Sequence, residues 1–435
     1  MKIAKKNNKE NNLQTVKGMR DFIGEQVFVY QGFCEKAAEI ALYYGFKPIE
    51  TPILEKEDLF RRSLGQDTDV VSKEMFTLKT KGGDHLVMRP EGTASVMRAY
   101  VENGMQALPQ PVMLYYSGPF FRHENTQRGR YRQFYQFGLE VLGSKKSILD
   151  ATIIKLTTTI LEESGFDNYT LKINSIGDTD CRSTYRRDLV NYYKKNLKAI
   201  CPDCRERLKT NPLRLLDCKN PMCQEIKKEA PESIASLCAP CKAHFKEVLE
   251  YLDAMNIPYE IDSTLVRGLD YYSRTVFEVF VNDKGENGET LPLAIGGGGR
   301  YDYLAKSLGI KKEIPAVGVS IGIDRLVELP SYVKHAPRIV KKPKVFFIQL
   351  SFEAKLRSFE VIEALRKVRI SLTHSISKDS LSAQLAIAEK MNVPYTIILG
   401  QKEALEGTVI VRNMDTRSQD TIKIDKLADY LKKIK

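Results

Sequence analysis

The stretch FFRHENTQRGRYRQFYQFGLEVLG, residues 120–143, alternates apolar and polar residues on both sides of a basic segment. Alternation with period two predicts two strands joined by a loop. The residues that share the polar face are Phe120, Arg122 and Glu124 on the first arm and Gln136, Gly138 and Glu140 on the second. Such a face, with room left by the glycine, suits a small zwitterionic ligand beside a phosphate. A solvated hairpin whose charges pair across the strands is the alternative.

Positive charge marks both this loop, which holds Arg128, Arg130 and Arg132, and the chain as a whole. The 435 residues carry a net charge of +12, which favours a polyanionic partner. A hydrophobic share of 43% and a charged share of 28% are typical of a globular protein of two or three domains. No apolar run approaches transmembrane length, so we expect no membrane partner and a cytoplasmic location.

The N-terminal part predicts a tail, a helix and an edge strand. Residues 1–16 are rich in Lys and Asn and are expected to be disordered. Apolar residues then recur at helical spacing from Val27 to Tyr44, with Gly45 at the position that ends a helix. Pro48 and Pro52 follow in an extended apolar segment, which is expected at a sheet edge because proline cannot donate to a ladder.

Residues 72–100 predict a strand pair followed by a helix. The turn is expected at Lys81–Asp84, the second strand ends at Pro90, and the helix begins near Thr93. Glu91 and Thr93 therefore stand at a strand-to-helix corner, where polar side chains can converge on a ligand. The alternative is structural, with Thr93 as helix cap and Glu91 favoured by the helix dipole.

A lysine-rich, mostly helical region from residue 177 to 258 contains seven of the eight cysteines. Two Cys-x-x-Cys pairs, each with proline inside, resemble zinc knuckles and predict one structural Zn²⁺ site. The expected ligands are Cys201, Cys204, Cys238 and Cys241, with Cys218 and Cys223 as spare thiols or alternative ligands. The alternative is a set of reduced cysteines that bind nothing.

Two later segments carry residues that suit phosphate and carboxylate chemistry. Arg267 is followed by Gly268, so its guanidinium and the main chain can both approach a ligand; pairing with Asp262 or Asp270 is the alternative. Strand alternation implies that Tyr271 and Tyr272 point to opposite faces, so that at most one faces a given pocket.

The run of four glycines at 296–299 can admit a planar base or a phosphate near the main chain, with a tight turn as the alternative. Arg325 stands near the start of a further predicted helix, where it could meet an anionic or aromatic ligand.

The last part of the chain predicts a separate module. Residues 331–343 are a proline-containing basic linker, and alternating strand and helix patterns beyond it predict a compact α/β domain with a mostly parallel sheet. From residue 341 to 435 there are 18 basic and 11 acidic residues. A basic α/β module suggests an arm that grips RNA, and a protein-docking module stays open.

These segments together resemble the histidyl-tRNA synthetase family, from Lys17 to the C-terminus. The residues that carry the resemblance are Thr51-Pro52-Ile53, FRHENTQRGRYRQFYQFGLEVLG, LVRGLDYY and GVSIGIDRL. The resemblance implies an α+β class II synthetase with an antiparallel active-site sheet flanked by helices. Its implied parts are a tail (1–16), a catalytic domain (17–330) with a cysteine-rich helical insertion (177–258), a linker (331–343) and an anticodon-binding α/β domain (344–435).

The resemblance also implies a role for individual residues. Histidine would be bound by Glu91, Gly92, Thr93, Gln136, Glu140, Arg267, Tyr271 and Tyr272, with Glu140 and Tyr272 reading the two ring nitrogens. ATP would be bound by Arg122, Glu124, Arg130 and Arg325. Arg267 and Arg122 would be catalytic, because they stabilise charge on the α-phosphate as the histidine carboxylate attacks.

The implied activity is that of a histidine–tRNA ligase, which forms histidyl-adenylate and pyrophosphate and then transfers histidine to the 3′ end of its tRNA. ATP as substrate, Mg²⁺ and a homodimer belong to that expectation, whereas the structural Zn²⁺ rests on the cysteines alone. The alternative from another class is a synthetase-like regulatory subunit of ATP phosphoribosyltransferase, which charges no tRNA. Arg122, Arg267, Arg325 and the basic C-terminal module argue against it.

Overall fold

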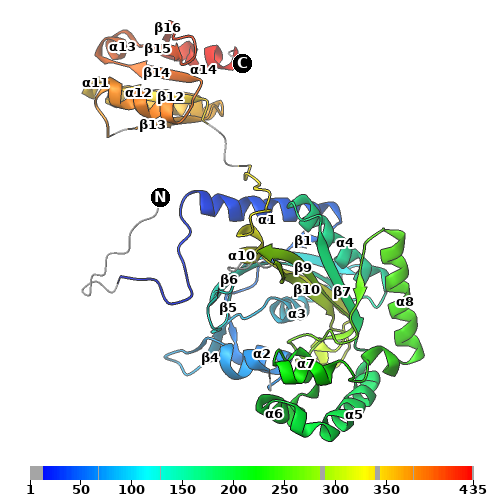
Figure 1. Cartoon of the computed structure of the whole chain (residues 1–435). Coiled ribbons are helices and arrows are strands. Elements are labelled where there is room, and N and C mark those ends of the chain that lie inside the picture. Colours follow the sequence, from blue (N-terminus) through cyan, green and yellow to red (C-terminus); the bar gives the residue numbers. More distant parts are fainter. Residues whose placement is uncertain are drawn as a thin grey trace. The chain divides into compact units, whose positions relative to one another are not determined.

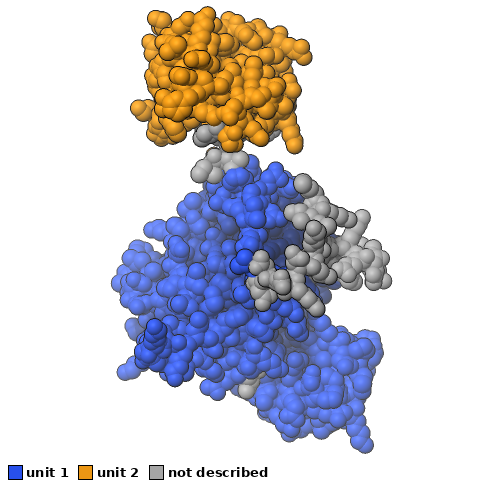
Figure 2. Space-filling view, turned by 90° about the vertical axis from the view of Figure 1, so that its left-hand side faces the viewer, with its two compact units in different colours: residues 1–337 blue, residues 338–435 orange. Residues whose placement is uncertain are grey.

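The protein is described by a computed structural model that covers residues 13–66, 68–127, 129–284, 290–338, 343–375 and 377–433, with backbone only at residues 283–284 and 290–291. Two compact units divide between Pro337 and Arg338, within the predicted linker; Figure 1 shows their elements and Figure 2 colours them separately. Residues 1–12 of the predicted tail lie outside the described residues. None of the described helices has the length and apolar character that a membrane crossing needs.

The first unit is built on an eight-stranded sheet in the order β1-β5-β6-β11-β10-β9-β7-β8. Its strands are β1 (Lys47–Pro48), β5 (Val112–Phe121), β6 (Gln133–Leu142), β7 (Tyr169–Ser175), β8 (Glu260–Ile261), β9 (Ser273–Lys284), β10 (Thr290–Arg300) and β11 (Ala316–Gly322). The central strands pair antiparallel, whereas the two-residue edge strands β1 and β8 pair parallel. The predicted antiparallel α+β sheet is confirmed, and Pro48 lies at its edge.

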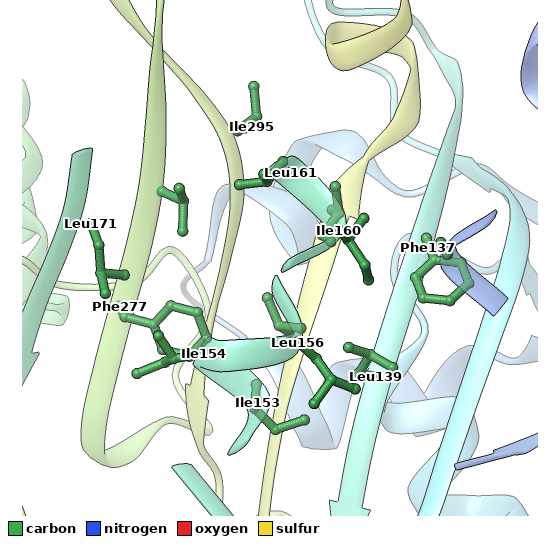
Figure 3. Close-up of a cluster of buried hydrophobic side chains, with 14 of the residues drawn as sticks. Phe137, Leu139, Ile153, Ile154, Leu156, Ile160, Leu161, Leu171, Phe277 and Ile295 are labelled. Atoms are coloured by element: carbon green, nitrogen blue, oxygen red, sulfur yellow. The ribbon is translucent and has the colours of Figure 1, made fainter. Parts of the chain in front are cut away.

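The second arm, β6, forms as the alternation predicts, and Phe121 of β5 lies opposite Gln133. The first arm is wrong in part, because β5 ends at Phe121 and leaves Arg122 and Glu124 in the loop. One face of the sheet packs on the main hydrophobic core, to which β6 contributes Phe137, Leu139 and Val141. Figure 3 shows Phe137 and Leu139 beside side chains of α4 (Ile148–Glu163), with Leu171 and Phe277 from neighbouring strands. Complete burial of each such side chain contributes roughly 1.5–3 kcal/mol to the free energy of unfolding, so the packing on this face stabilises the sheet.

Three helices cover the core face of the sheet. They are α1 (Glu25–Tyr43), α4 and α8 (Ala239–Ala254), and each places buried apolar residues in the main core. α1 occupies the segment that the helical spacing predicts. α4 begins at Ile148 and ends before Gly165, which takes a positive φ of 91° that few other residues adopt.

The opposite face of the sheet carries shorter elements and a second core. A three-stranded sheet in the order β2-β4-β3 lies within this region. The elements are β2 (Leu54–Lys56), α2 (Glu57–Leu64), a π-turn η1 (Val70–Glu74), β3 (Thr77–Lys79), β4 (His85–Met88), α3 (Thr93–Glu102), a 3₁₀ turn η2 (Met105–Ala107) and α9 (Leu304–Ser307). The short helix α10 (Ile323–Val327) follows β11 and places Ile323 and Leu326 in the main core. The predicted turn between β3 and β4 and the helix start at Thr93 are both found.

The predicted insertion is helical. It contains α5 (Thr179–Lys195), α6 (Pro202–Thr210), α7 (Pro221–Lys227) and α8, with 3₁₀ turns η3 (Leu197–Ala199), η4 (Pro212–Asp217) and η5 (Ser233–Ser236) between them. It has a small core of its own, in which Tyr185, Leu189 and Tyr193 of α5 pack beside four cysteines.

The second unit is an α/β domain with a five-stranded sheet in the order β13-β12-β14-β15-β16. Its elements are β12 (Val345–Gln349), α11 (Phe352–Lys367), β13 (Leu372–His374), α12 (Leu381–Lys390), β14 (Tyr395–Leu399), α13 (Gln401–Glu406), β15 (Thr408–Asn413), β16 (Gln419–Lys423) and α14 (Ile424–Lys433). The prediction of a mostly parallel sheet is wrong, because the sheet is mixed. β12 pairs parallel with β13 and β14, whereas β14–β15 and β15–β16 pair antiparallel. The short link between β15 and β16 closes only an antiparallel hairpin.

Candidate active site

A cavity of about 410 Å³ lies over the face of the large sheet that points away from the main core. It is lined by residues from β6, α3, the loop after β5, the segment before β9, and β10, β11 and α10. The predicted site residues that line it are Glu91, Thr93, Arg122, Glu124, Arg130, Gln136, Arg267, Tyr271, Tyr272 and Arg325. Segments more than 200 residues apart in the chain therefore meet here, as the resemblance implies.

Glycines form much of the floor of this cavity. Gly138 of β6 and Gly297 of β10 both lie opposite Ser320 of β11, and Gly318 lies two residues before Ser320, opposite Glu140. A Cβ at Gly138 would overlap the ring of Tyr116, one at Gly318 the carboxylate of Glu140, and one at Gly297 the guanidinium of Arg267. The room at Gly138 is therefore taken by a tyrosine of the protein and not by a ligand, which corrects the prediction. Each glycine lets one functional side chain cross the sheet surface.

The carboxylate of Glu91 lies at the start of α3. It accepts hydrogen bonds from the backbone N–H of Thr93 at 2.7 Å and of Ala94 at 2.8 Å. The alternative in which Thr93 caps the helix is wrong, because Gly92 holds the N-cap position and Thr93 donates its hydroxyl elsewhere. Gly92 packs against Tyr116 and does not line the cavity. Burial raises the pKa of Glu91.

Glu140 lies beneath the cavity lining and is fully buried. Its carboxylate accepts hydrogen bonds from the hydroxyls of Thr93 at 2.8 Å, Tyr116 at 3.2 Å and Tyr301 at 2.5 Å. Burial raises the pKa of Glu140 to about 8, although these donors oppose the shift. Of the two residues expected to read the imidazole, Tyr272 lines the cavity, whereas Glu140 is not among the lining residues and is joined to the cavity through the Tyr301 hydroxyl.

The loop after β5 supplies a group of opposite charges. Arg122 donates through Nε to the Pro90 carbonyl at 2.9 Å, which holds the guanidinium at the corner before α3. Glu124 lies 3.8 Å from Arg122 and 3.6 Å from Arg130. Distances of this length leave the two arginines able to turn toward an anion. Arg128, predicted in the same loop, lies outside the described residues.

Arg267 lies on the other side of the cavity and pairs with Glu278 of β9 at 3.1 Å. The alternative pairing with Asp262 or Asp270 is thus wrong. Burial alone would lower the pKa of Arg267, but Glu278 and Tyr272 outweigh it and raise this pKa above its ordinary value. The guanidinium carbon lies 5.7 Å from the Tyr272 ring centroid, and Nε is buried without a partner among the described residues.

Tyr271 and Tyr272 both line the cavity, and their ring centroids are 4.6 Å apart. The prediction that they point to opposite faces is wrong, because β9 begins only at Ser273 and strand alternation does not apply before it. Arg182 of α5 donates to the carbonyls of Asp270 at 3.2 Å and Tyr272 at 2.9 Å. The insertion therefore helps to hold this irregular segment.

The glycine run 296–299 lies within β10, so the alternative of a tight turn is wrong. Gly296 and Gly297 line the cavity, where a ligand can approach the main chain. Arg325 of α10 reaches over this strand and donates to the carbonyls of Gly129 at 3.1 Å and Ala294 at 2.6 Å. Burial lowers the pKa of Arg325, and nearby Arg130 adds to the effect. Among the described residues Arg325 has no carboxylate within ion-pair distance, which makes it a cation ready for an anionic ligand.

Several functional residues escape the sequence pattern. Glu278 is the one acidic residue in the apolar strand pattern of residues 275–281, and this exception is the signal that could have found it. Tyr301 stands two residues after the glycine run, and Tyr116 belongs to a mostly apolar strand. Arg214 of η4 reaches the cavity from the insertion and pairs with Asp69 at 2.8 Å, a contact that no local pattern predicts.

The four predicted zinc ligands do not meet at one point. Cys201 and Cys204 group with Cys218 and Cys223, whereas Cys238 and Cys241 group with Asp178 and Cys181. The single predicted site is therefore wrong in its composition. Two equal Cys-x-x-Cys motifs suggest a shared ion, but the helices between them lead each pair to a different partner.

Comparisons with known proteins agree with this geometry. Residues 18–326 match a model described as histidyl-tRNA synthetase, and residues 344–434 match one described as an anticodon binding domain. The chain is 40% identical over 422 residues to a relative from Caldicellulosiruptor saccharolyticus named histidine–tRNA ligase, which covers 97% of this chain and 99% of the relative. A relative of the same name from Thermosipho melanesiensis is 42% identical over 410 residues, or 94% of this chain and 96% of the relative.

Solved structures extend the likeness to the fold. The apo histidyl-tRNA synthetase of S. aureus is 31% identical and superposes with a TM-score of 0.79 over 97% of this chain and 100% of that one. The full-length match to these relatives, joined to a synthetase-like cavity on an antiparallel sheet, leads to one conclusion: this chain belongs to the histidyl-tRNA synthetase family.

Proposed function

We propose that this protein is a histidine–tRNA ligase, which activates histidine with ATP and transfers it to the 3′ end of its tRNA. The observation that carries the proposal is the convergence of Arg122, Arg267 and Arg325 around one cavity that also holds Glu91 and Gln136. Three guanidinium groups suit a triphosphate, and a carboxylate beside an amide oxygen suits an ammonium group.

The histidine subsite is proposed at the α3 end of the cavity. The α-ammonium group would be held by Glu91 and by the Gln136 side-chain oxygen, which is buried without a partner among the described residues. The imidazole would lie near Tyr271 and Tyr272, with Glu140 behind them. Glu140 orients Thr93 and Tyr301 by hydrogen bonds, so these hydroxyls can present fixed partners to the ring nitrogens. A site built on such polar pairs rejects isosteres that lack the nitrogens.

The ATP subsite is proposed along the arginines. Arg122 would bind the α-phosphate, Glu124 and Arg130 the rest of the nucleotide, and Arg325 the distal phosphate. A carboxylate oxygen of histidine then attacks the α-phosphorus, the bond to the bridging oxygen breaks, and pyrophosphate leaves. Arg267, fixed by Glu278, stabilises the charge that gathers on the α-phosphate oxygens. The protein mainly positions the groups, because phosphoryl chemistry of this kind needs little covalent help.

The donor set fits the Mg²⁺ that such a reaction uses. Glu124 and Glu278 line the cavity and offer the carboxylate oxygens that this ion prefers beside phosphates. Mg²⁺ would supply charge neutralisation on the leaving pyrophosphate. The structural Zn²⁺ is a separate question, taken up below with a corrected ligand set.

Residues 344–434 would bind the anticodon part of the tRNA, in keeping with the domain model they match. A homodimer and a cytoplasmic location stay predictions from the resemblance, the first measurable by light scattering of the purified protein. A regulatory role without tRNA charging is less supported, because the cavity keeps its arginines and the C-terminal domain is present.

Histidine-dependent exchange between ATP and radiolabelled pyrophosphate tests the proposal. We expect robust exchange with histidine, and we expect Arg267→Ala to lower it by at least about 100-fold, the typical effect of removing one charge-stabilising donor. Arg366→Ala is the matched control, because Arg366 is an exposed arginine of α11 in the second unit. Exchange with another amino acid and none with histidine would contradict the proposal.

A further inference from the structure

The insertion holds seven cysteines, and all seven belong to two tight clusters. The four-cysteine cluster consists of Cys201, Cys204, Cys218 and Cys223, all buried. The Asp178 cluster consists of Asp178, Cys181, Cys238 and Cys241. Within each cluster the candidate ligand atoms all lie within 4.8 Å of one another.

The four-cysteine cluster has the dimensions of a tetrahedral thiolate site. A metal ion bound at about 2.3 Å from four sulfurs places neighbouring sulfurs about 3.8 Å apart. The Sγ atoms of Cys201 and Cys218 are 3.8 Å apart. A disulfide would need a separation of about 2.05 Å, and all cysteines of the described chain are free. The thiols are therefore spaced for a shared ion and not for bonds with one another.

Local structure favours thiolates at these positions. Cys201 is the N-cap of α6, Cys204 lies in the first turn of that helix, and Cys223 lies in the first turn of α7. Helix N-termini stabilise negative charge on sulfur. The backbone N–H of Cys201 also donates to the Sγ of Cys223 at 3.2 Å, which joins the two halves of the cluster.

We propose that Cys201, Cys204, Cys218 and Cys223 bind one structural Zn²⁺ as four thiolates. Four protein sulfurs leave no open position on the ion, so the role is structural and not catalytic. The core around the cluster is small, with seven buried apolar side chains besides the cysteines, and an ion would staple it.

The position of this ion links it to the active site. η4 (Pro212–Asp217) lies between Cys204 and Cys218, and its Arg214 and Asp217 line the cavity. Arg214 pairs there with Asp69, which also approaches Arg207 of α6 at 3.8 Å. The ion would therefore anchor both ends of the segment that carries Arg214 to the cavity.

The Asp178 cluster carries a second proposal on independent contacts. Asp178 is the N-cap of α5 and Cys181 lies in its first turn, while Cys238 and Cys241 hold the same two positions on α8. Asp178 uses Oδ1 to accept the backbone N–H of Cys181 at 3.0 Å. Its Oδ2 lies 3.2 Å from the Sγ of Cys241 and 3.5 Å from that of Cys238, near the roughly 3.6 Å edge of a mixed oxygen–sulfur site.

The geometry points to a second Zn²⁺ at this cluster, bound by three thiolates and the Asp178 carboxylate. The backbone N–H of Cys238 donates to the Sγ of Cys181 at 3.1 Å, which repeats the arrangement of the first cluster. Arg182 directly follows Cys181 and holds the carbonyls of Asp270 and Tyr272. This ion would therefore brace the segment that places Tyr271 and Tyr272 in the cavity.

Zinc content of the full-length protein tests both sites. We expect two equivalents per chain after purification with reductant and without chelator. Cys204→Ala and Cys241→Ala should each leave one equivalent, because each removes a ligand from one cluster only. Cys34→Ala should leave two, because Cys34 belongs to neither cluster. Less than half an equivalent in the unaltered protein after reconstitution with Zn²⁺ would overturn both proposals.

X-ray absorption and thiol counting on the unaltered protein keep the test decisive if a variant loses both ions by unfolding. The ligands of the two ions together should be seven sulfurs near 2.3 Å and one oxygen near 2.0–2.2 Å. A shell dominated by nitrogen or oxygen would refute the ligand sets. Denaturation with alkylation, without reductant, should label all eight cysteines, and protection by disulfides would refute both sites.

Discussion

Glu140 shows how one residue combines structural and chemical constraints. It is fully buried, yet hydroxyls of Thr93, Tyr116 and Tyr301 satisfy both of its oxygens. The cost of burying its charge raises its pKa to about 8, so this carboxyl takes up a proton at a higher pH than an exposed glutamate does. Its neighbours are therefore held by a group whose charge changes within the physiological range.

This pKa predicts a pH dependence of stability. An unfolded chain releases the proton of Glu140 near pH 4.3, whereas the folded protein keeps it up to about pH 8. The folded state therefore binds the extra proton in this window, and the unfolding free energy falls as pH rises through it. We expect Glu140→Gln to reduce this fall by an amount on the order of a few kcal/mol, measured by urea unfolding at pH 5 and pH 9.

Glu363→Gln is the matched control, because Glu363 is an exposed glutamate that pairs with Arg366 on the same helix. It should leave the pH dependence of the unaltered protein in place. Equal pH dependence for Glu140→Gln and the unaltered protein would contradict a raised pKa at Glu140.

At the scale of elements, the central feature is the glycine-lined face of β10 and β11. Gly298 faces the other way, and its neighbours there are backbone atoms of β11 rather than side chains. Strands β10 and β11 carry residues of the cavity floor, and both pair with further strands of the sheet. A side chain that separates them would disturb the floor as a whole.

We expect Gly298→Ala to destabilise the protein by roughly 1–3 kcal/mol, the typical cost of overpacking. The new Cβ would overlap the carbonyl oxygen of Gly318, which belongs to the backbone and cannot turn away. Thermal unfolding followed by circular dichroism would measure the effect. Gly82→Ala is the control, because the nearest atoms to its Cβ lie at 3.7 Å. Equal melting temperatures for the two variants would refute the close packing of β10 on β11.

The whole molecule consists of two units with separate cores. The hydrophobic clusters of the second unit contain only residues from 345 onward, and those of the first unit only residues up to 332. The cavity is likewise lined only by residues of the first unit. Each unit therefore has the apolar interior that an independent domain needs.

A chain that ends after Pro337 is expected to fold and to keep histidine-dependent pyrophosphate exchange within about threefold of the full-length rate. Transfer to tRNA should fall on the order of 100-fold, equivalent to about 3 kcal/mol of lost binding, because the anticodon-binding domain is missing. Exchange and aminoacylation assays on the same preparation measure both steps. If the shortened chain lost both pyrophosphate exchange and tRNA charging, the assignment of these two steps to separate units would be contradicted.

Local patterns in the sequence predict the elements well. The strand β6, the helix α1 and the start of α3 occur where periodicity and turn residues place them. Patterns fail in two cases: where they assume a regular strand that has not yet begun, and where they suggest a turn in a segment that is a strand. Tyr271 and Tyr272 precede their strand, and the glycine run, for which a tight turn was the alternative, forms part of a central strand.

The sequence by itself determined the two-unit organisation, the antiparallel sheet and ten of the residues that line the cavity, because alternation and composition are local properties and the family motifs are specific. Only the tertiary structure decided which residues are partners: Glu278 for Arg267, Tyr301 for Glu140, and two cysteine clusters in place of one. The physical reason is that such contacts join segments brought together by packing, which local sequence patterns do not encode.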